Sequence, residues 1–221
     1  MKFAVIVFPG SNCDHDIYTV INSLDGASAE FVWHKEKDVS SYDAIAIPGG
    51  FSYGDYLRAG AIARFSPIME SVIKESKKGK PIIGICNGFQ VLVESGLLPG
   101  ALIINSGTKF LSKNVSLTAC NNDTVFTNLI DSNKELVMPI AHRQGNYMAT
   151  DEIIKSLEDN NQIAFKYSKL KGGNPNGSVC DIAGVFNKEK TILGMMPHPE
   201  RAAESILGSS DGLSIFKSML K

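Results

Sequence analysis

The sequence has no long uninterrupted apolar stretch and no excess of charge of either sign. Its longest early apolar run, Phe3–Phe8, is too short for a membrane span or for the core of a signal peptide. Lys and Arg together number 22 against 23 Asp and Glu, so there is no broad basic field to attract nucleic acid or an anionic membrane. We therefore expect a cytoplasmic protein that binds neither nucleic acid nor membrane.

The sequence also lacks the spacings that mark metal and phosphate sites. Its four cysteines, Cys13, Cys86, Cys120 and Cys180, form no C-x-x-C pair, and without an export signal they are expected to be reduced thiols. Neither a P-loop nor a G-x-G-x-x-G motif is present, and no cluster has metal-ligand spacing. We expect no metal and no cofactor in this chain.

The first half of the chain alternates short apolar strands with amphipathic helices. An apolar fraction of 43% over 221 residues is enough for a large core. Strands are expected at Phe3–Phe8, Glu30–His34, Asp43–Ile47 and Pro81–Ile85. Helices are expected after a cap at Asn12 or Asp14, after Ser66-Pro67, and from about Gly88 to Ser95. This alternation predicts an α/β fold with a doubly wound, mostly parallel central sheet flanked by helices.

The second half of the chain is richer in strands. Alternating or apolar segments at 114–119, 136–141, 163–167, 182–186 and 191–196 predict strands, and a last helix is expected over 212–220 behind an Asp211 cap. No linker, repeat or low-complexity tract divides the chain. We therefore expect a single domain over 1–221 with a β-rich second half.

The segment Gly84–Gly88 carries the clearest sign of chemistry. It places Cys86 between a predicted buried strand and a predicted helix, the setting of a nucleophile elbow. Flanking glycines allow the sharp turn, and the helix N-terminus favours the thiolate. The N–H of Asn87 would then face a developing oxyanion. The alternative is a small cysteine buried in the core.

A base for this thiol is expected at His198, in the sequence Pro197–Glu200. Each proline keeps the residue before it extended, and in an extended segment residues two apart face the same way. Glu200 can therefore reach the His198 ring, fix its tautomer and stabilise the imidazolium. The alternative is a structural histidine.

A second oxyanion donor is expected after the third strand, at Gly49 and Gly50. Consecutive glycines leave backbone N–H groups free to approach a substrate. A loop that cradles phosphate is the alternative, but no Gly-Lys-Ser/Thr follows it.

The remaining histidines and one loop give weaker signals. His15 is expected to be solvated or to act as a cap, His34 to lie at the surface, and His142 to be a possible site residue at the start of a loop. The segment Lys171–Ser178 is dense in Gly, Pro and Asn, and is expected to be a surface loop, either mobile or facing a substrate or partner.

These residues together resemble the triad-type, class I glutamine amidotransferases. The match runs in order through Pro48–Gly50, Cys86–Gln90, Ala141-His142 and Pro197–Glu200. Longer strings sharpen it, namely Gly49–Arg64, Pro9–Asp14, Asn174–Ser178 and Pro197–Arg201. Within that family the chain is similar to the separate glutaminase subunits of phosphoribosylformylglycinamidine synthases.

The resemblance implies a Cys86–His198–Glu200 triad that hydrolyses glutamine, with Gln90 in contact with the substrate. It implies docking on a large synthetase subunit that uses ATP and magnesium, together with a small accessory subunit, in de novo purine synthesis. One departure is local. After His142 the family usually has Gly-Glu, whereas this chain has Arg143-Gln144, so no role is carried over to those two positions.

Two other classes of function remain open from the residues alone. A cysteine hydrolase or stress protein on a similar fold can also present an elbow cysteine, although many of those have His where this chain has Asn87. The second is a non-catalytic binding module that keeps the fold.

Overall fold

The computed structural model describes residues 1–131, 133–169 and 172–221. Its strands are β1 Lys2–Val7, β2 Ser28–Trp33, β3 Ala44–Ile47, β4 Ile82–Ile85, β5 Ala101–Ile103, β6 Leu111–Ala119, β7 Leu136–His142, β8 Asn146–Met148, β9 Ile163–Tyr167, β10 Ile182–Phe186 and β11 Ile192–Met195. Its α-helices are α1 Asp14–Asn22, α2 Pro67–Ser76, α3 Asn87–Glu94, α4 Asp151–Asp159 and α5 Leu213–Met219. Short 3-10 turns include η1 Ser52–Asp55 and η4 Pro199–Ala202.

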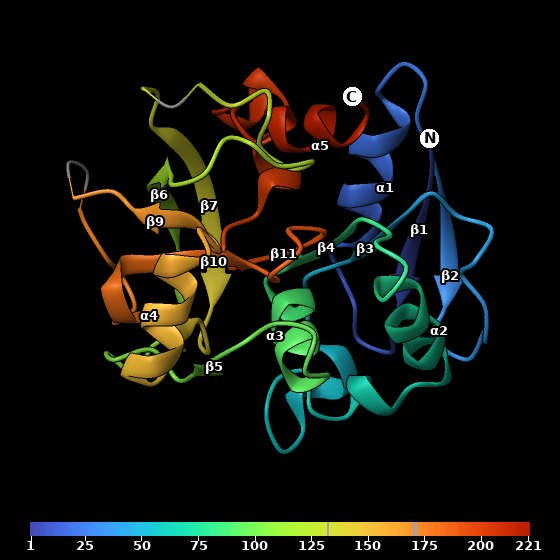
Figure 1. The fold of residues 1–221 in the computed structure, drawn as a ribbon, viewed down its shortest axis with the longest axis horizontal. Helices are drawn as coiled ribbons and strands as arrows, with labels where there is room; N and C mark the ends of the chain where they lie inside the picture. The colour runs from blue at the N-terminus through green and yellow to red at the C-terminus, as the bar shows by residue number, and fades with distance from the viewer. Residues whose placement is uncertain (132, 170–171) are drawn as a thin grey trace.

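Nine strands form one sheet in the order β2-β1-β3-β4-β11-β10-β9-β6-β7. The pairs from β2 to β11 are parallel, and those from β11 to β7 are antiparallel. Helices α1 and α5 lie on one face of the parallel part and α2 and α3 on the other (Figure 1). The predicted doubly wound α/β class is therefore confirmed, and the β-rich half extends the same sheet.

The parallel strands are buried on both faces, as their continuous apolar runs predict. All four residues of β3, β4 and β11 are buried, as are the four central residues of β1. The carboxyl ends of β1, β3, β4 and β11 meet at one edge of the sheet, because these neighbours run in parallel. Ligands bind at this edge in open α/β sheets.

None of the three predicted helix caps makes a side-chain cap bond. Helix α1 begins at Asp14 with Cys13 at the cap position, and α5 has Gly212 there, in neither case with a side-chain cap bond. Ser66 occupies the N-cap position of α2, with Pro67 first in the helix as predicted, but its hydroxyl bonds that of Tyr53 at 2.9 Å and makes no cap bond. Asp211 instead accepts from the backbone N–H of Val137. Long-range partners thus engage the side chains of Ser66 and Asp211 in place of the helix ends.

Candidate active site

Cys86 lies at the turn from β4 into α3. Its backbone has φ 53° and ψ −105°, a strained conformation for an L-residue, and it occupies the N-cap position of α3. The flanking glycines are sterically required: a β-carbon on Gly88 would lie 2.0 Å from the carbonyl oxygen of Ile47, and one on Gly84 would lie 2.8 Å from Gly88. This is the geometry of a nucleophile elbow.

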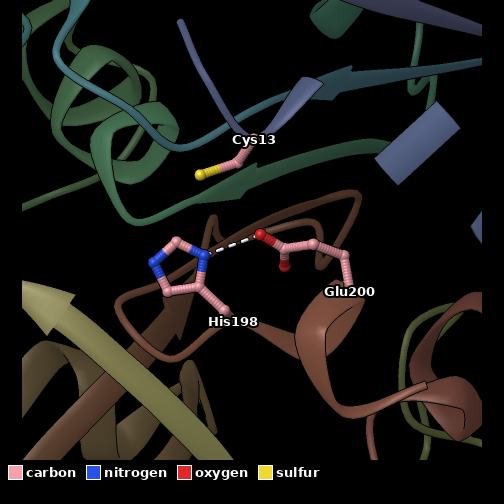
Figure 2. Close-up of side chains that lie close together, drawn as sticks. All are labelled: Cys13, His198 and Glu200. Atoms are coloured by element: carbon pink, nitrogen blue, oxygen red, sulfur yellow. Dashed lines mark hydrogen bonds and ion pairs between the residues drawn. The ribbon is translucent and has the colours of Figure 1, made fainter. Parts of the chain in front are cut away.

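His198 and Glu200 form a buried pair directly after β11. Nδ1 of His198 lies 2.6 Å from Oε1 of Glu200, and both side chains are almost wholly inaccessible to solvent (Figure 2). Burial by itself would lower the pKa of His198, but the charges of Glu200 and of a Cys86 thiolate hold that pKa well above its usual value. Nε2 of His198 is buried and has no hydrogen-bond partner among the described residues. The ring can therefore take or give a proton at Nε2 while Glu200 holds Nδ1.

Gly49 brings Cys86 and His198 together. A β-carbon on Gly49 would lie 2.8 Å from Cε1 of His198 and 3.3 Å from Cβ of Cys86, so both side chains pack against this glycine. The Cys86 thiol is also hydrogen-bonded to the carbonyl of Ala141 at 3.7 Å. Cys86 and His198 therefore share this glycine as a neighbour, and their action as a triad with Glu200 stays a prediction.

A second thiol, that of Cys13, lies next to the His198–Glu200 pair. Ligand atoms of Cys13, His198 and Glu200 all fall within 4.8 Å of one another. Figure 2 shows the three side chains close together. Nη2 of Arg201 lies 3.0 Å from the Cys13 sulfur, and Nε of Arg201 bonds Asp16. Burial raises the pKa of Cys13 in spite of the nearby cations. No role was predicted for Cys13 or Arg201 from the sequence, although both stand in strings that carry the family resemblance.

The Cys13–His198–Glu200 cluster is poorly suited to a metal ion. The 2.6 Å contact between Nδ1 and Oε1 leaves no space for a cation between these atoms, and the guanidinium of Arg201 already bonds the sulfur. The arrangement fits an ion pair instead.

A cavity of about 340 Å³ opens beside Cys86. It is lined by Gly50, Phe51, Gly54, Asp55, Cys86, Gln90, Phe110, Ala141, His142, Arg143 and Gln144. Cys13 is not part of this lining, so Cys86 is the thiol that a ligand in the cavity meets. Two larger hollows, of about 380 and 550 Å³, lie around Gly96 and Leu97 at the other end of α3 and contain no thiol.

Of the predicted oxyanion residues, Gly50 lines this cavity, whereas Gly49 and Asn87 are not among its lining residues. As the first residue of α3, Asn87 has no intrahelical acceptor for its backbone N–H. The Asn87 side chain is engaged elsewhere: Oδ1 accepts from Ser52, and Nδ2 donates to Asp55 and Gln90. Gly50 lines the cavity with φ 135°, a conformation that favours glycine.

Gln90 lines the cavity, but its amide is held by the protein. Its Oε1 accepts from Asn87 at 2.9 Å, and its Nε2 donates to the carbonyl of Gln144. The contact with a substrate that the resemblance implies stays a prediction.

Of the other three histidines, His34 differs from what the sequence predicts. His34 is buried, not at the surface: Nδ1 lies 2.8 Å from the Tyr53 hydroxyl, and burial lowers the pKa of the ring. His15 is exposed. His142 lines the cavity; burial lowers its pKa to about 4, and its Nδ1 bonds Oδ1 of Asn105.

The predicted loop before β10, described over residues 172–178, has two polar side chains that are buried in the protein. Lys171, where the predicted segment begins, lies outside the described residues. Asn176 and Ser178 are buried, and Nδ2 of Asn176 donates to the carbonyl of Gly145 at 2.8 Å. The expectation of a surface loop is therefore wrong for these two residues. The Asn176 amide and the Ser178 hydroxyl, which accepts from the backbone N–H of Tyr147, bind the start of β8.

Asp55 is a site residue that was not predicted from the sequence. It lines the cavity, and burial raises the pKa of its carboxyl group to about 6. Its position inside the string Gly49–Arg64 was the available signal.

None of the helices in the described ranges has both the length and the apolar character to cross a membrane.

Comparison with known proteins places this geometry among glutamine-using enzymes. A family model described as a CobB/CobQ-like glutamine amidotransferase domain matches residues 1–213. A structure of PurLQS from Thermotoga maritima is similar at 42% identity over 99% of this chain and 97% of that one, with a TM-score of 0.90.

Two more distant structures share the fold. One is a putative GMP synthase subunit from Thermoplasma acidophilum, at 17% identity over 100% of this chain and 92% of that one, with a TM-score of 0.66. The other is the glutaminase domain of CTPS from Trypanosoma brucei with bound acivicin, at 13% identity over 100% and 94%, with a TM-score of 0.63.

Proposed function

Because the chain belongs to the CobB/CobQ-like glutamine amidotransferase family, we propose that it hydrolyses glutamine and supplies the ammonia to a synthetase subunit that makes formylglycinamidine ribonucleotide in purine synthesis. The catalytic residues of this proposal are Cys86, His198 and Glu200. The observation that carries it is the buried contact of His198 with Glu200, adjacent to a strained cysteine that opens on the cavity.

The chemistry begins with the side-chain amide of glutamine over Cys86. His198 takes the thiol proton at Nε2, and the sulfur attacks the amide carbonyl. The N–H groups of Asn87 and of the Gly50 segment hold the oxyanion, and one such donor is worth about 2.7–4 kcal/mol. The carbon–nitrogen bond then breaks as His198 protonates the leaving nitrogen. Water attacks the thioester, the thiol is restored, and glutamate leaves.

Glu200 fixes which nitrogen of His198 exchanges protons in this cycle. Its carboxylate holds Nδ1 of His198, so Nε2 is the nitrogen that exchanges protons. The raised pKa of His198 means that the imidazolium is stabilised once the proton has been transferred. His142 has its pKa lowered to about 4, so it is neutral at working pH and does not compete as an acid.

The ammonia requires a partner. In water at neutral pH it is almost wholly protonated and is not a nucleophile, so the proposal includes transfer through protein to a large synthetase subunit. ATP and magnesium belong to that subunit, and a small accessory subunit completes the complex. The 42% identity to PurLQS supports this assignment.

Two single substitutions in the complex test the proposal. Cys86→Ala is expected to lower glutamine-supported synthesis by about a thousandfold or more, while synthesis from added ammonia survives. Cys13→Ala, the matched control, is expected to keep glutamine-supported synthesis within about tenfold, because Cys13 does not line the cavity.

Other results would redirect the assignment. Equal loss of both syntheses in Cys86→Ala gives Cys86 a structural role, and loss in Cys13→Ala alone makes Cys13 the nucleophile. A wild-type complex that hydrolyses no glutamine indicates a binding module. Labelling of Cys86 by a glutamine-analogue electrophile, competed by glutamine, separates an amidotransferase from other cysteine hydrolases.

A further inference from the structure

Two charged side chains of opposite sign line the cavity and have no part in the triad. Asp55 comes from the loop after β3, and Arg143 comes from the turn after β7. Within the described ranges neither of them forms an ion pair with another side chain. Asp55 is half-buried and Arg143 is exposed at the rim of the cavity. Because an unpaired charge is costly where it is partly buried, a ligand that brings a cation to Asp55 and an anion to Arg143 would be bound favourably.

Free glutamine has this pattern of charge. One end carries an α-ammonium and an α-carboxylate on the same carbon, and the other end carries the amide that has to reach Cys86. We infer that Asp55 binds the α-ammonium and Arg143 binds the α-carboxylate, so that the two residues select a free amino acid. This inference rests on the proposed function and extends it to substrate specificity.

Arg143 is held where it can serve this role. Its carbonyl accepts from the backbone N–H of Asn105 at 2.9 Å, and its Nε donates to the carbonyl of Thr108 at 3.3 Å. The neighbouring carbonyl, that of Gln144, is bound by Gln90. With Nε engaged, the two terminal nitrogens are the donors that can meet a carboxylate as a pair.

Asp55 is fixed in an equally specific way. Nδ2 of Asn87 donates to its Oδ1 at 3.2 Å, which leaves Oδ2 for a ligand. Its backbone has φ 54°, and Tyr53 and Leu57 in the same loop are also left-handed. Such strain persists where the surrounding structure enforces it, often at ligand sites. The pKa of about 6 keeps Asp55 largely ionised at neutral pH.

Substrates that lack one charged group test each contact separately. The assay uses the complex with its synthetase, with glutamine, Nα-acetylglutamine and glutamine α-methylamide as substrates. Arg143→Gln is expected to lower kcat/KM at least about tenfold for glutamine, mainly through KM, and less than about twofold for the α-methylamide. Asp55→Asn is expected to show the same pattern, with Nα-acetylglutamine as the insensitive substrate. Arg58→Gln, whose arginine pairs with Glu94 outside the cavity lining, is the control.

Equal losses on all three substrates would overturn the inference, because they would mean that the variants disturb the fold of the site. Unchanged kcat/KM for glutamine would overturn it as well. Glutamine binding to the Cys86→Ala complex, measured by calorimetry, separates this inference from the proposed function. Weaker binding in the Asp55→Asn and Arg143→Gln backgrounds supports the inference even if the wild-type complex fails to turn over.

Discussion

Single residues at the sheet edge carry strain and unpaired charge that the rest of the fold must offset. Cys86 has a backbone conformation that costs about 1–3 kcal/mol for an L-residue. The Asp55 carboxyl group is partly desolvated, and its main partner is an uncharged amide. Both features destabilise the folded state, and both are next to the cavity. A site that has to bind and react with a ligand commonly costs stability in this way.

The first prediction concerns the stability of Asp55→Asn as a function of pH. The folded-state pKa of Asp55 is about 6 against an ordinary value of 3.8, so the folded state favours the protonated carboxyl. The stability that this group contributes is therefore present below about pH 4 and lost as pH rises through 6. Asp55→Asn is expected to increase the free energy of unfolding by about 1 kcal/mol at about pH 7–8, a value reduced for the partial exposure of this side chain, and to leave it unchanged at about pH 4.

Urea unfolding at about pH 4, 6 and 8 checks this prediction. A variant that is less stable than wild type at the highest pH would show that the charged carboxylate stabilises the fold and that burial does not penalise its charge. Asp151→Asn, in the first turn of α4 and away from the cavity, is a suitable control.

At the scale of elements, the site depends on how closely α3 approaches β3. Gly88 in the first turn of α3 packs directly on the carbonyl of Ile47, the last residue of β3. The same helix begins directly after Cys86 and carries Asn87 and Gln90. The close helix–strand contact therefore sets the position of several groups at once.

The second prediction compares two substitutions in helices. Gly88→Ala would place its β-carbon 2.0 Å from a backbone oxygen, so α3 must shift, and a loss of about 3 kcal/mol or more in stability is expected, together with loss of glutaminase activity. Thr150→Ala removes the cap bond between the Thr150 hydroxyl and the N–H of Ile153 at the start of α4, and is expected to cost about 1 kcal/mol without loss of activity.

Thermal unfolding and glutaminase assay of the complex measure both effects. Full activity in Gly88→Ala would show that α3 can move away from β3 without moving Cys86, and would contradict the dependence of the site on the contact between Gly88 and Ile47.

At the scale of the whole molecule, one strand joins the two halves of the chain. β11 comes from the second half, yet it pairs in parallel with β4 and antiparallel with β10. His198 follows this strand directly, so the histidine reaches the cysteine only when both halves form one sheet. We expect folding of the molecule and assembly of the site to be a single event.

The third prediction is that both halves unfold together. Trp33, the single tryptophan, lies in the edge strand β2 of the first half. Phe126 in the second half is fully buried and stacks on Phe186 with ring centroids 6.0 Å apart. Phe126→Ala is expected to lower stability by about 3–5 kcal/mol and to shift the Trp33 fluorescence transition as far as the circular-dichroism transition. A Trp33 transition that stays at its wild-type urea concentration would mean that the halves unfold independently.

Much of the site follows from short stretches of sequence. The contact of His198 with Glu200 is local and was predicted, but the extended backbone ends at His198, because Pro199–Ala202 forms a 3-10 turn. The glycines around Cys86 predict the elbow, which is also local. The continuous apolar runs of β1, β3 and β4 predict buried parallel strands, because burial on both faces leaves no polar alternation.

Other features depend on contacts between residues far apart in the chain. Cys13 and Arg201 meet across 188 positions, Asp55 and Arg143 line one cavity from separate loops, and His34 is buried against Tyr53. Periodicity and turn chemistry report the local backbone and carry no information about such distances. The sequence by itself therefore determined the strands of the main sheet, the helices of the first half, the elbow and the His–Glu pair, whereas α4, β5 and β8 were not predicted. The tertiary structure alone decided which second thiol, which acid and which arginine surround them, because only the packed sheet edge brings those segments together.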